Sequence, residues 1–516
     1  MRAIAAAAVG LMMAGWLVPH SAPARDIVWI LVDDLRPLLG CYGEKNAHTP
    51  NLDRLAQEGV RFERAYCQAA KCGPSRISML SGLRPETTRV WSHKEADWQR
   101  FRQRQADWKS LPQALRAAGW TTRAFGKVSH DGWVDDADWS LPAEPGREGE
   151  MLEIVDEAAL KNVPYAERAQ VPTLIADRKK CPAIQAADVP DDALFAGRMT
   201  HRVREVLQQA GPEPHFLAIG YRRPHLPMVA PSKYFDLHPA EQQILPSNRQ
   251  PPKGAPWFAW FNSDGYQGMI RQLKVPVVSP PTDAAEAMEW NGFELRSYLG
   301  VPTHGPIPDD RQREIWQAYR ACISYVDAQI GLLLQALRQH PRWRDAAVVV
   351  TSDHGWHLGD QTAWTKMTNY EVATRVPLLI HVPGVTPAGA VIRQPVELLD
   401  LAPTFLDCAG LPIPKALEGH SLLPLLQNPD TTDADAVACS SFPRFQDLMG
   451  QAARDARYRY VRWLDASTGR LRGEELYDHE VDPGETVNRA PQHPEICQRL
   501  ATRLDQVMKR TEPQKP

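Results

Sequence analysis

Two apolar segments that lie far apart in this chain end in the same way, with acidic residues directly behind a strand-like run. Residues 27–32 read IVWILV and precede Asp33 and Asp34, and residues 346–351 read AAVVVT and lead through Ser352 to Asp353 and His354. Continuous apolar runs of this length predict strands that are buried on both faces of a sheet. Adjacent carboxylates at a strand end repel one another unless a cation lies between them. Taken alone, the Asp33-Asp34 pair is also consistent with a helix N-cap.

The rest of the chain predicts helices that alternate with strands. Further strands are expected at 216–220 and 378–382. The clearest helix carries one apolar stripe, formed by Ile315, Tyr319, Cys322, Val326, Ile330, Leu333 and Leu337. This alternation predicts an α/β fold with a mostly parallel sheet flanked by helices. Ligands bind beyond the carboxyl ends of the strands in such sheets, so both acidic pairs are expected at one site.

The length of 516 residues is enough for one large and one smaller domain. Residues 1–24 combine a positive start, an apolar stretch and a small-x-small cleavage pattern, and predict the signal peptide of an exported protein; an uncleaved membrane anchor is the alternative. Residues 25–430 are expected to form the catalytic domain and residues 431–516 a C-terminal α+β subdomain. The Pro- and Trp-rich regions 133–191 and 246–308 predict long loops around a site.

Charge and cysteine content set expectations about partners. The net charge of −3 gives no support for a nucleic-acid partner or for an anionic membrane surface once the signal peptide is removed. The eight cysteines include no CxxC pair and no Cys/His zinc pattern. Cys41, Cys67, Cys322 and Cys408 lie among apolar or small residues and are interpreted as buried thiols or occasional bridges, and no bridge is assigned to Cys181.

Cys72 lies in a different setting, the segment CGPSR at 72–76, which runs on into Leu80, Ser81 and Gly82. Pro74 suits the first turn of a helix, and Gly82 suits its end. Cys72 is therefore expected at a helix N-terminus, where unpaired N–H groups and the helix dipole favour a thiolate or an anion. A buried cysteine at an ordinary helix start explains Cys-x-Pro alone but not the whole string.

This string resembles the signature of the formylglycine-dependent sulfatases. The resemblance implies that a formylglycine-generating maturation enzyme oxidises Cys72 to an aldehyde, whose hydrate is the nucleophile. Two positions depart from the family pattern: Ser81 stands where Thr is usual, and Leu83 stands where Arg is usual, although Arg84 follows. These positions assist maturation, so the departures concern its efficiency and leave the core of the signature intact.

The resemblance covers nearly all of the mature chain and is greatest toward the iduronate-2-sulfatase branch of the family. The similar segments are 31–37, 72–89, 126–130, 220–225, 305–308, 352–356, 364–366 and 475–478. The resemblance implies an alkaline-phosphatase-like fold for the larger domain. It also implies one bound Ca2+, with Mg2+ as the less expected ion.

The family likeness assigns roles to individual residues. The expected metal ligands are Asp33, Asp34, Asp353, His354 and the modified side chain of Cys72. Lys127 and Lys366 match the sulfate-binding lysines, and Arg76 is expected to hold the formylglycine hydrate. Such cations suit a site where a sulfate ester carries negative charge. His225 is expected to act as general acid on the leaving oxygen, and His130 to help deprotonate the second hydrate hydroxyl. Outside their motifs, these lysines and histidines would be interpreted as surface or structural residues.

Substrate specificity is expected to depend on residues around this group, in addition to Lys127, His225 and Lys366. Trp356 is placed to pack on a sugar ring, and Arg222 and Arg223 suit a uronate carboxylate, although a solvated loop explains two arginines equally well. We expect a sulfatase that acts on a 2-O-sulfated uronic acid in a glycosaminoglycan or similar acidic polysaccharide. The alternatives are a sulfatase for another sugar or small ester, a phosphonate or phosphate monoester hydrolase of the same superfamily, a non-catalytic metal- and glycan-binding protein, and a hydrolase that uses the unmodified thiol.

Overall fold

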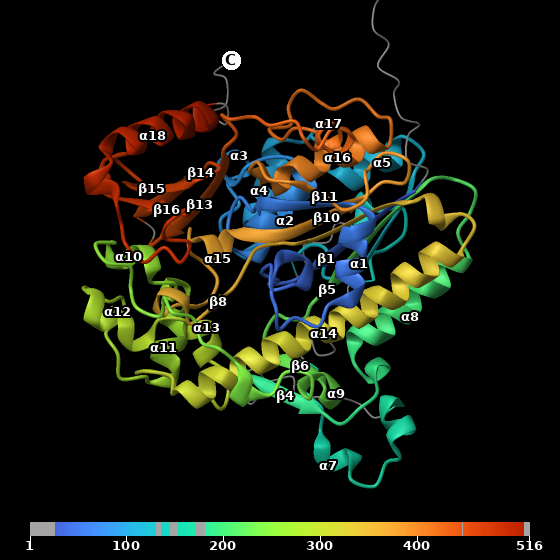
Figure 1. The fold of residues 1–516 in the computed structure, drawn as a ribbon, viewed down its shortest axis with the longest axis horizontal. Helices are drawn as coiled ribbons and strands as arrows, with labels where there is room; N and C mark the ends of the chain where they lie inside the picture. Colours follow the sequence, from blue (N-terminus) through green and yellow to red (C-terminus); the bar gives the residue numbers. More distant parts are fainter. Residues whose placement is uncertain (1–25, 131–135, 145–152, 171–180, 446, 510–516) are drawn as a thin grey trace, which may run out of the picture.

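The computed structural model describes residues 26–130, 136–144, 153–170, 181–445 and 447–509, so the predicted signal peptide lies outside the described residues. Its centre is an eight-stranded sheet with the order β11-β2-β10-β7-β1-β5-β3, in which β12 also pairs with β2 (Figure 1). The strands are β1 (Ile27–Val32), β2 (Val60–Tyr66), β3 (Thr121–Gly126), β5 (His215–Tyr221), β7 (Ala347–Ser352), β10 (Arg375–His381), β11 (Ala390–Ile392) and β12 (Val396–Glu397).

The four strands predicted from the sequence are present as β1, β5, β7 and β10. β1 lies at the centre and pairs in parallel with β5 on one side and β7 on the other. β10 runs antiparallel to both of its neighbours, β7 and β2. Five of the seven strand pairings in the described sheet are parallel, so the sheet is mostly parallel with one reversed strand.

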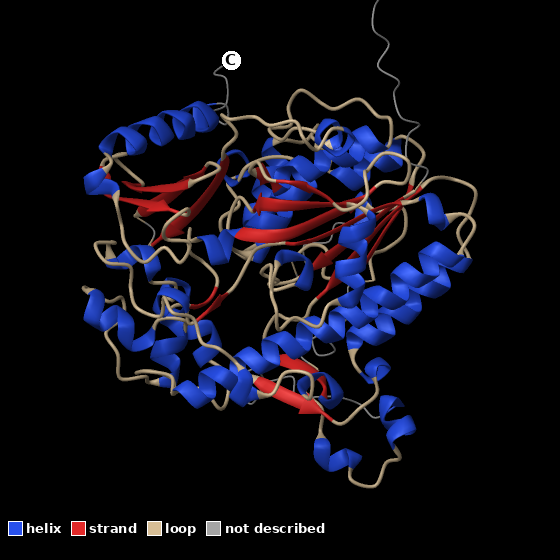
Figure 2. Cartoon of the chain, viewed as in Figure 1, coloured by secondary structure: helices blue, strands red, loops and turns tan. Residues whose placement is uncertain are grey.

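Helices cover both faces of the sheet, as an apolar run such as β1 requires (Figure 2). Val28, Ile30 and Val32 belong to the core on one face, which is covered by α14 (Asp309–Gln339), α8 (Phe195–Gln208) and α1 (Pro50–Glu58). Ile27, Trp29 and Leu31 belong to the core on the other face, beneath α2 (Cys72–Ser81), α5 (Leu111–Ala117) and α16 (Leu401–Cys408). The predicted apolar stripe of 315–337 lies within α14.

A second sheet follows near the C-terminus, beside the central sheet (Figure 1). Its four antiparallel strands are β13 (Ala438–Arg444), β14 (Leu448–Arg454), β15 (Tyr458–Asp465) and β16 (Leu471–Asp478). α18 (Pro494–Lys509) packs on it through Leu500 and Leu504. The buried side chain of Arg459 joins this sheet to the larger domain, because it forms ion pairs with Glu371 and, at 2.8 Å, with Glu485. The α+β content agrees with the sequence prediction, and the boundary at residue 430 stays a prediction.

The Pro- and Trp-rich regions expected as loops contain short helices and strands where they are described.

The other α-helices and strands of the described residues are α3 (Pro85–Thr88), α4 (Glu95–Arg104), α7 (Glu157–Leu160), β4 (Ile184–Ala187), β6 (Met228–Pro231), α9 (Ser232–Phe235), α10 (Trp257–Trp260), α11 (Gln267–Leu273), α12 (Ala284–Trp290), α13 (Phe293–Arg296), β8 (His357–Leu358), β9 (Trp364–Thr365), α15 (Glu371–Thr374) and α17 (Leu423–Gln427). Within the described ranges, no helix is both long and apolar enough to span a bilayer. Cys41, Cys67, Cys322 and Cys408 form no disulfide.

Candidate active site

The two acidic pairs meet at the carboxyl edge of the central sheet. β1 and β7 are neighbours in register, with Val32 opposite Ser352, so the residues that follow both strands emerge side by side. The backbone N–H of Asp34 donates to Asp353 Oδ1 at 3.1 Å. Asp33, Asp34 and Asp353 are fully buried. The predicted convergence of these carboxylates is therefore present in the structure.

The N-terminus of α2 brings Cys72 to these carboxylates. The helix has Pro74 in its first turn, and it ends at Gly82, whose φ of 67° suits glycine and whose N–H donates to the Ser78 carbonyl at 2.8 Å. Cys72 is 1% exposed. Its Sγ lies within 4.8 Å of ligand atoms of Asp33, Asp34 and His225, and likewise of Asp353 and His354. Residue 72 is thus within a side chain's reach of every predicted metal ligand.

Arg76, one turn into α2, connects the carboxylates of the two strands. Its Nη2 lies 2.7 Å from Asp33 Oδ1, and its Nε lies 2.9 Å from Asp353 Oδ2. Burial alone would lower the pKa of Arg76, but the charges of Asp353 and Asp33 raise it, so the guanidinium stays protonated. Arg76 therefore fixes the two carboxylates beside residue 72.

The two predicted sulfate-binding lysines each face one carboxylate. Lys127, which follows β3, has its Nζ 2.6 Å from Asp33 Oδ2, and Lys366, which follows β9, has its Nζ 3.0 Å from Asp34 Oδ1. Both side chains are 2% exposed. Burial would lower both pKa values, but Asp33 raises that of Lys127 and Asp34 raises that of Lys366. The buried carboxylates thus keep two ammonium groups charged at one point.

His354 presents an unprotonated nitrogen to Cys72. Its Nδ1 lies 2.9 Å from the carbonyl oxygen of Gly355, which can only accept, so we assign the ring proton to Nδ1. Nε2, which then carries the lone pair, lies 3.3 Å from Cys72 Sγ and 3.4 Å from Asp34 Oδ1. Burial lowers the pKa of His354, which keeps the ring neutral and able to bind a cation.

The donors around residue 72 fit a divalent cation with a preference for oxygen. Burial, followed by the charges of Asp33 and Asp353, raises the pKa of Asp34 well above its usual value despite the opposing charge of Lys366. A divalent ion would remove this repulsion. Carboxylate oxygens suit Ca2+ or Mg2+, whereas a thiolate is a soft ligand that suits neither. The site therefore fits a hard cation best when residue 72 offers oxygen in place of sulfur.

His225, which follows β5, also faces Asp34. Its Nδ1 lies 2.6 Å from the carbonyl oxygen of Leu226, and its Nε2 faces the site, 3.9 Å from Asp34 Oδ2. Burial, with the charges of Lys366 and Lys127, lowers the pKa of His225 well below its usual value. A bound anionic ester acts in the opposite direction and favours protonation. The position suits proton donation to a leaving oxygen.

His130 is half-buried and stacks on His93, with ring centroids 3.9 Å apart and an interplanar angle of 29°. His93 is exposed, yet nearby protein atoms partly desolvate its ring and lower its pKa well below the usual value. The charges of Lys71, His130, Lys366 and Lys127 lower this pKa further. His93 and Lys71 were not predicted as site residues. Lys71 directly precedes Cys72, so the sequence already places it beside the site, whereas only the fold brings His93 here.

The two arginines predicted to contact the sugar differ in position: Arg222 borders the site, and Arg223 is buried behind it. Arg222 is half-buried, and its charge acts on Lys127 and His225, so it borders the site. Arg223 is 1% exposed, pairs with Glu153 at 3.2 Å and donates to the carbonyls of Val229 and His225. Arg223 therefore positions the His225 loop, in contrast to the predicted contact with a uronate carboxylate.

Trp356 also lies deeper than the sequence suggested. Its side chain is 1% exposed, and the Nζ of Lys366 lies 4.9 Å from the ring centroid. A cation held over an indole face is stabilised by the ring quadrupole. In the structure, Trp356 supports Lys366 and offers little surface to a sugar.

Two residues of the 246–308 region enter the site without any sequence signal. Glu294 on α13 has its Oε1 3.4 Å from Lys366 Nζ and 3.9 Å from His225 Nε2. Asn262 donates to the carbonyls of Trp364 and Lys366 at 2.7 and 2.6 Å. The expectation that this region surrounds a site is confirmed, although its individual contributions were missed.

Comparison with known proteins agrees with this geometry. The family described as Sulfatase matches residues 25–411. The chain belongs to the sulfatase family. The family described as N-sulphoglucosamine sulphohydrolase, C-terminal, matches residues 359–510. Iduronate 2-sulfatase of Mus musculus is 31% identical, over 89% of this chain and 90% of the relative. The protein is thus a sulfatase, a sulfuric ester hydrolase, similar to iduronate 2-sulfatase.

Solved structures show the same fold. Phosphonate monoester hydrolase of Agrobacterium radiobacter aligns with a TM-score of 0.69 at 21% identity, covering 95% of this sulfatase and 96% of that chain. A 2-O GAG sulfatase aligns with a TM-score of 0.64 at 21% identity, covering 95% and 93%. The alkaline-phosphatase-like fold predicted for the larger domain is confirmed.

Proposed function

We propose that this sulfatase uses formylglycine at position 72 and one Ca2+ to hydrolyse the 2-O-sulfate of a uronic acid in a glycosaminoglycan or similar acidic polysaccharide. The observation that carries the proposal is the convergence of Cys72, three carboxylates and two buried lysines at one point. Export through the predicted signal peptide and conversion by a formylglycine-generating enzyme belong to the same proposal.

The thiol itself is a poor nucleophile in this position. Burial raises the pKa of Cys72, and the charges of Lys127 and Lys366 do not offset it. A thiol-dependent hydrolase would need the opposite shift. Oxidation to an aldehyde and hydration give residue 72 two hydroxyl groups in place of sulfur, which suits the hard donors around it.

The residues that would hold the ion are Asp33, Asp34, Asp353, His354 and modified residue 72. Bound there, the ion supplies electrostatic stabilisation of negative charge on oxygen. Among the ligands, the His354 nitrogen is the least typical for calcium, since calcium takes mainly oxygen.

The chain's own side chains account for the steps of the reaction. Lys127 and Lys366 bind the sulfate oxygens, and one hydroxyl of the residue 72 hydrate attacks sulfur as its proton passes to a neighbouring carboxylate of the site. His225 gives a proton to the departing sugar oxygen as the S–O bond breaks. His130 takes the proton of the second hydroxyl, so that the C–O bond to sulfate breaks and the aldehyde re-forms. Water is consumed only in hydrating the aldehyde again.

The proposed substrate depends on the border of the site, where Arg222 is half-buried. Arg222 provides a charge for a uronate carboxylate there. The similarity to iduronate 2-sulfatase and to a 2-O GAG sulfatase supports the same substrate class. A sulfatase for another sugar ester is the alternative that a substrate screen would reveal.

The test combines peptide mass spectrometry of the Cys72 segment with a screen of defined sulfated disaccharides. We expect formylglycine at residue 72, and release of sulfate from a 2-O-sulfated uronate that is faster than from 6-O- or N-sulfated glucosamine. An unmodified thiol in active protein would refute the nucleophile, and a preference for glucosamine sulfates would refute the substrate.

A further inference from the structure

Glu294 is a buried carboxylate beside the sulfate-binding residues that none of the steps above uses. Its side chain is 5% exposed, and its Oε1 lies between Lys366 Nζ, at 3.4 Å, and His225 Nε2, at 3.9 Å. A negative charge this close to an anion-binding lysine weakens the binding of every anion. The structure nevertheless places it there, buried, where the charge is only slightly screened by water.

The backbone fixes Glu294 relative to Lys366. The amide of Asn262 donates to the Lys366 carbonyl at 2.6 Å, while its oxygen accepts from the N–H of Gly292 at 2.9 Å, at the start of α13. Gly292 has a φ of 75°, and a Cβ added to it would meet the Cβ of Trp364 at 2.6 Å. α13 and the Lys366 segment are thus held together as one unit, so the carboxylate is a fixed feature of the site.

The ion-paired groups of the site have a simple charge balance. Three buried cations, Arg76, Lys127 and Lys366, face the carboxylates of Asp33, Asp34, Asp353 and Glu294. With the divalent ion that the ligands fit, one net positive charge remains in this group. A group without Glu294 would retain two.

We propose that Glu294 sets the charge selectivity of the site, favouring esters with one negative charge over phosphate monoesters with two. This inference rests on the proposed function, because it takes the site as one that binds sulfate esters. Sulfate esters and phosphonate monoesters carry one negative charge. A phosphate monoester carries close to two above its second pKa of about 6.

The direction of the effect follows from Coulomb's law. Removal of the Glu294 charge increases the attraction for each unit of negative charge on the ligand, so a dianion gains more than a monoanion. At short range and in a partly desolvated site, one charge changes binding by roughly tenfold or more. The ratio of kcat/KM for a phosphate monoester to kcat/KM for a sulfate ester should therefore rise. This holds even if the substitution also changes the turnover of both substrates by one common factor.

The experiment compares Glu294→Gln with Glu294→Asp, which keeps the charge, and with Glu289→Gln on the exposed face of α12, which makes the same change in net charge elsewhere. Each calcium-loaded variant is assayed at about pH 7.5 with 4-nitrophenyl sulfate, 4-nitrophenyl phenylphosphonate and 4-nitrophenyl phosphate, and residue 72 conversion is measured by mass. We expect Glu294→Gln to raise the phosphate-to-sulfate ratio of kcat/KM about tenfold or more. The phosphonate-to-sulfate ratio should change far less, and the other two variants should keep both ratios.

A binding measurement makes the test independent of turnover. Thermal-shift titration with phenyl phosphate and phenyl sulfate should show the same relative gain for the phosphate in Glu294→Gln. Unchanged ratios in both assays, or an equal gain for phosphonate and phosphate, would overturn the inference. If fully converted wild-type protein hydrolyses no sulfate ester, the proposed function fails, and the binding ratio alone decides the charge selectivity.

Discussion

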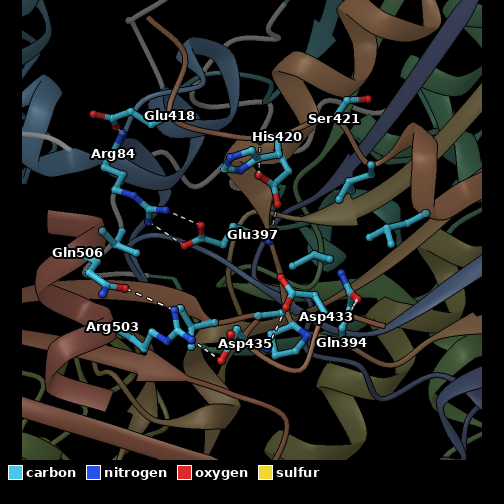
Figure 3. A pocket seen from close by; sticks show the side chains of 18 residues that line it. Arg84, Gln394, Glu397, Glu418, His420, Ser421, Asp433, Asp435, Arg503 and Gln506 are labelled. Carbon is cyan, nitrogen blue, oxygen red and sulfur yellow. Dashed lines mark hydrogen bonds and ion pairs between the residues drawn. The ribbon is translucent and has the colours of Figure 1, made fainter. Parts of the chain in front are cut away.

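The two ends of helix α2 carry charged residues in contrasting arrangements. At the N-terminus, the carboxylates of Asp33 and Asp353 and their cations converge on Cys72. Beyond the C-terminus lies a cavity of about 480 Å3, where charged side chains of the lining form two separate ion pairs (Figure 3). There, Arg84 binds Glu397 through two nitrogens, and Arg503 pairs with Asp435.

The contrast shows which observation identifies a candidate active site. At the N-terminus of α2 it is the meeting of several charged side chains at one residue, and the presence of a cavity at the other end carries less weight. Around Cys72, several carboxylates share few cations and point at one reacting group, which suits a bound ion and an anionic substrate. Around Arg84, the ion pairs are separate, and the Asp400 carboxylate accepts from backbone N–H groups, which suits a structural role. The departures from the family signature belong to the structural end, where the Ser81 hydroxyl accepts from the N–H of Leu83 at 3.1 Å.

The largest loss of activity is expected from substitution of Cys72 at the N-terminus of α2. Cys72→Ala removes the side chain that we propose becomes formylglycine, so we expect kcat/KM for 4-nitrophenyl sulfate to fall by about 10^4-fold or more. The melting temperature should change little, because a small buried side chain is replaced by one of similar size. Comparable turnover by purified Cys72→Ala would show that residue 72 is not the nucleophile.

The next largest effect is expected from Lys366. Lys366→Met removes the ammonium group that faces Asp34 and the sulfate, so kcat/KM should fall by about 10^2- to 10^3-fold. Lys233→Met is the control, since Lys233 is 55% exposed and pairs with Asp191 on the surface. Equal losses in both variants would argue against a specific role for Lys366 in anion binding.

The sequence predicted the N-terminal end of α2 far better than its surroundings. Strands β1 and β7 were identifiable because burial on both faces imposes apolar runs, and Cys72 was identifiable because its motif combines a helix start with reactive chemistry. The reversal of β10 was not predictable, since an antiparallel strand buried on both faces has the same apolar pattern.

Glu294, which sequence reasoning missed, and Arg223, which it placed wrongly, both take their positions from tertiary contacts. Glu294 lies on a helix of four residues, too short for a periodic signal, and reaches Lys366 only through tertiary contacts. Arg222 and Arg223 are adjacent, and the sequence does not reveal which of them faces the interior. The burial of Arg223 depends on its ion pair with Glu153, which lies far from it in the sequence, and on its hydrogen bond to the Val229 carbonyl in β6.

At the structural end of α2, substitution should affect stability and leave catalysis in place. Arg84→Met leaves the buried Glu397 carboxylate without its bidentate partner, so the free energy of unfolding should fall by about 3–5 kcal/mol. The kcat of the formylglycine-converted fraction should change less than about threefold. Arg503→Met is the matched control, because its pair with Asp435 is more exposed and should contribute about 1 kcal/mol or less. A larger loss of kcat than of stability in Arg84→Met would place this end of the helix in the reaction.

The smallest effect is expected from Asp400, whose carboxylate lies in the same cavity and accepts from the backbone N–H groups of Glu397 and His420 at 2.9 and 2.8 Å. Burial, with the charge of Glu397, raises the pKa of Asp400 to about 7. Its folded pKa lies above the unfolded value, so its contribution to stability is complete at low pH and is lost as pH rises toward 7. Relative to Asp400→Asn, the wild-type protein should lose on the order of 2 kcal/mol of unfolding free energy between about pH 5.5 and pH 7. Urea unfolding of both proteins across this range measures the difference, and parallel pH curves would show that Asp400 does not titrate there.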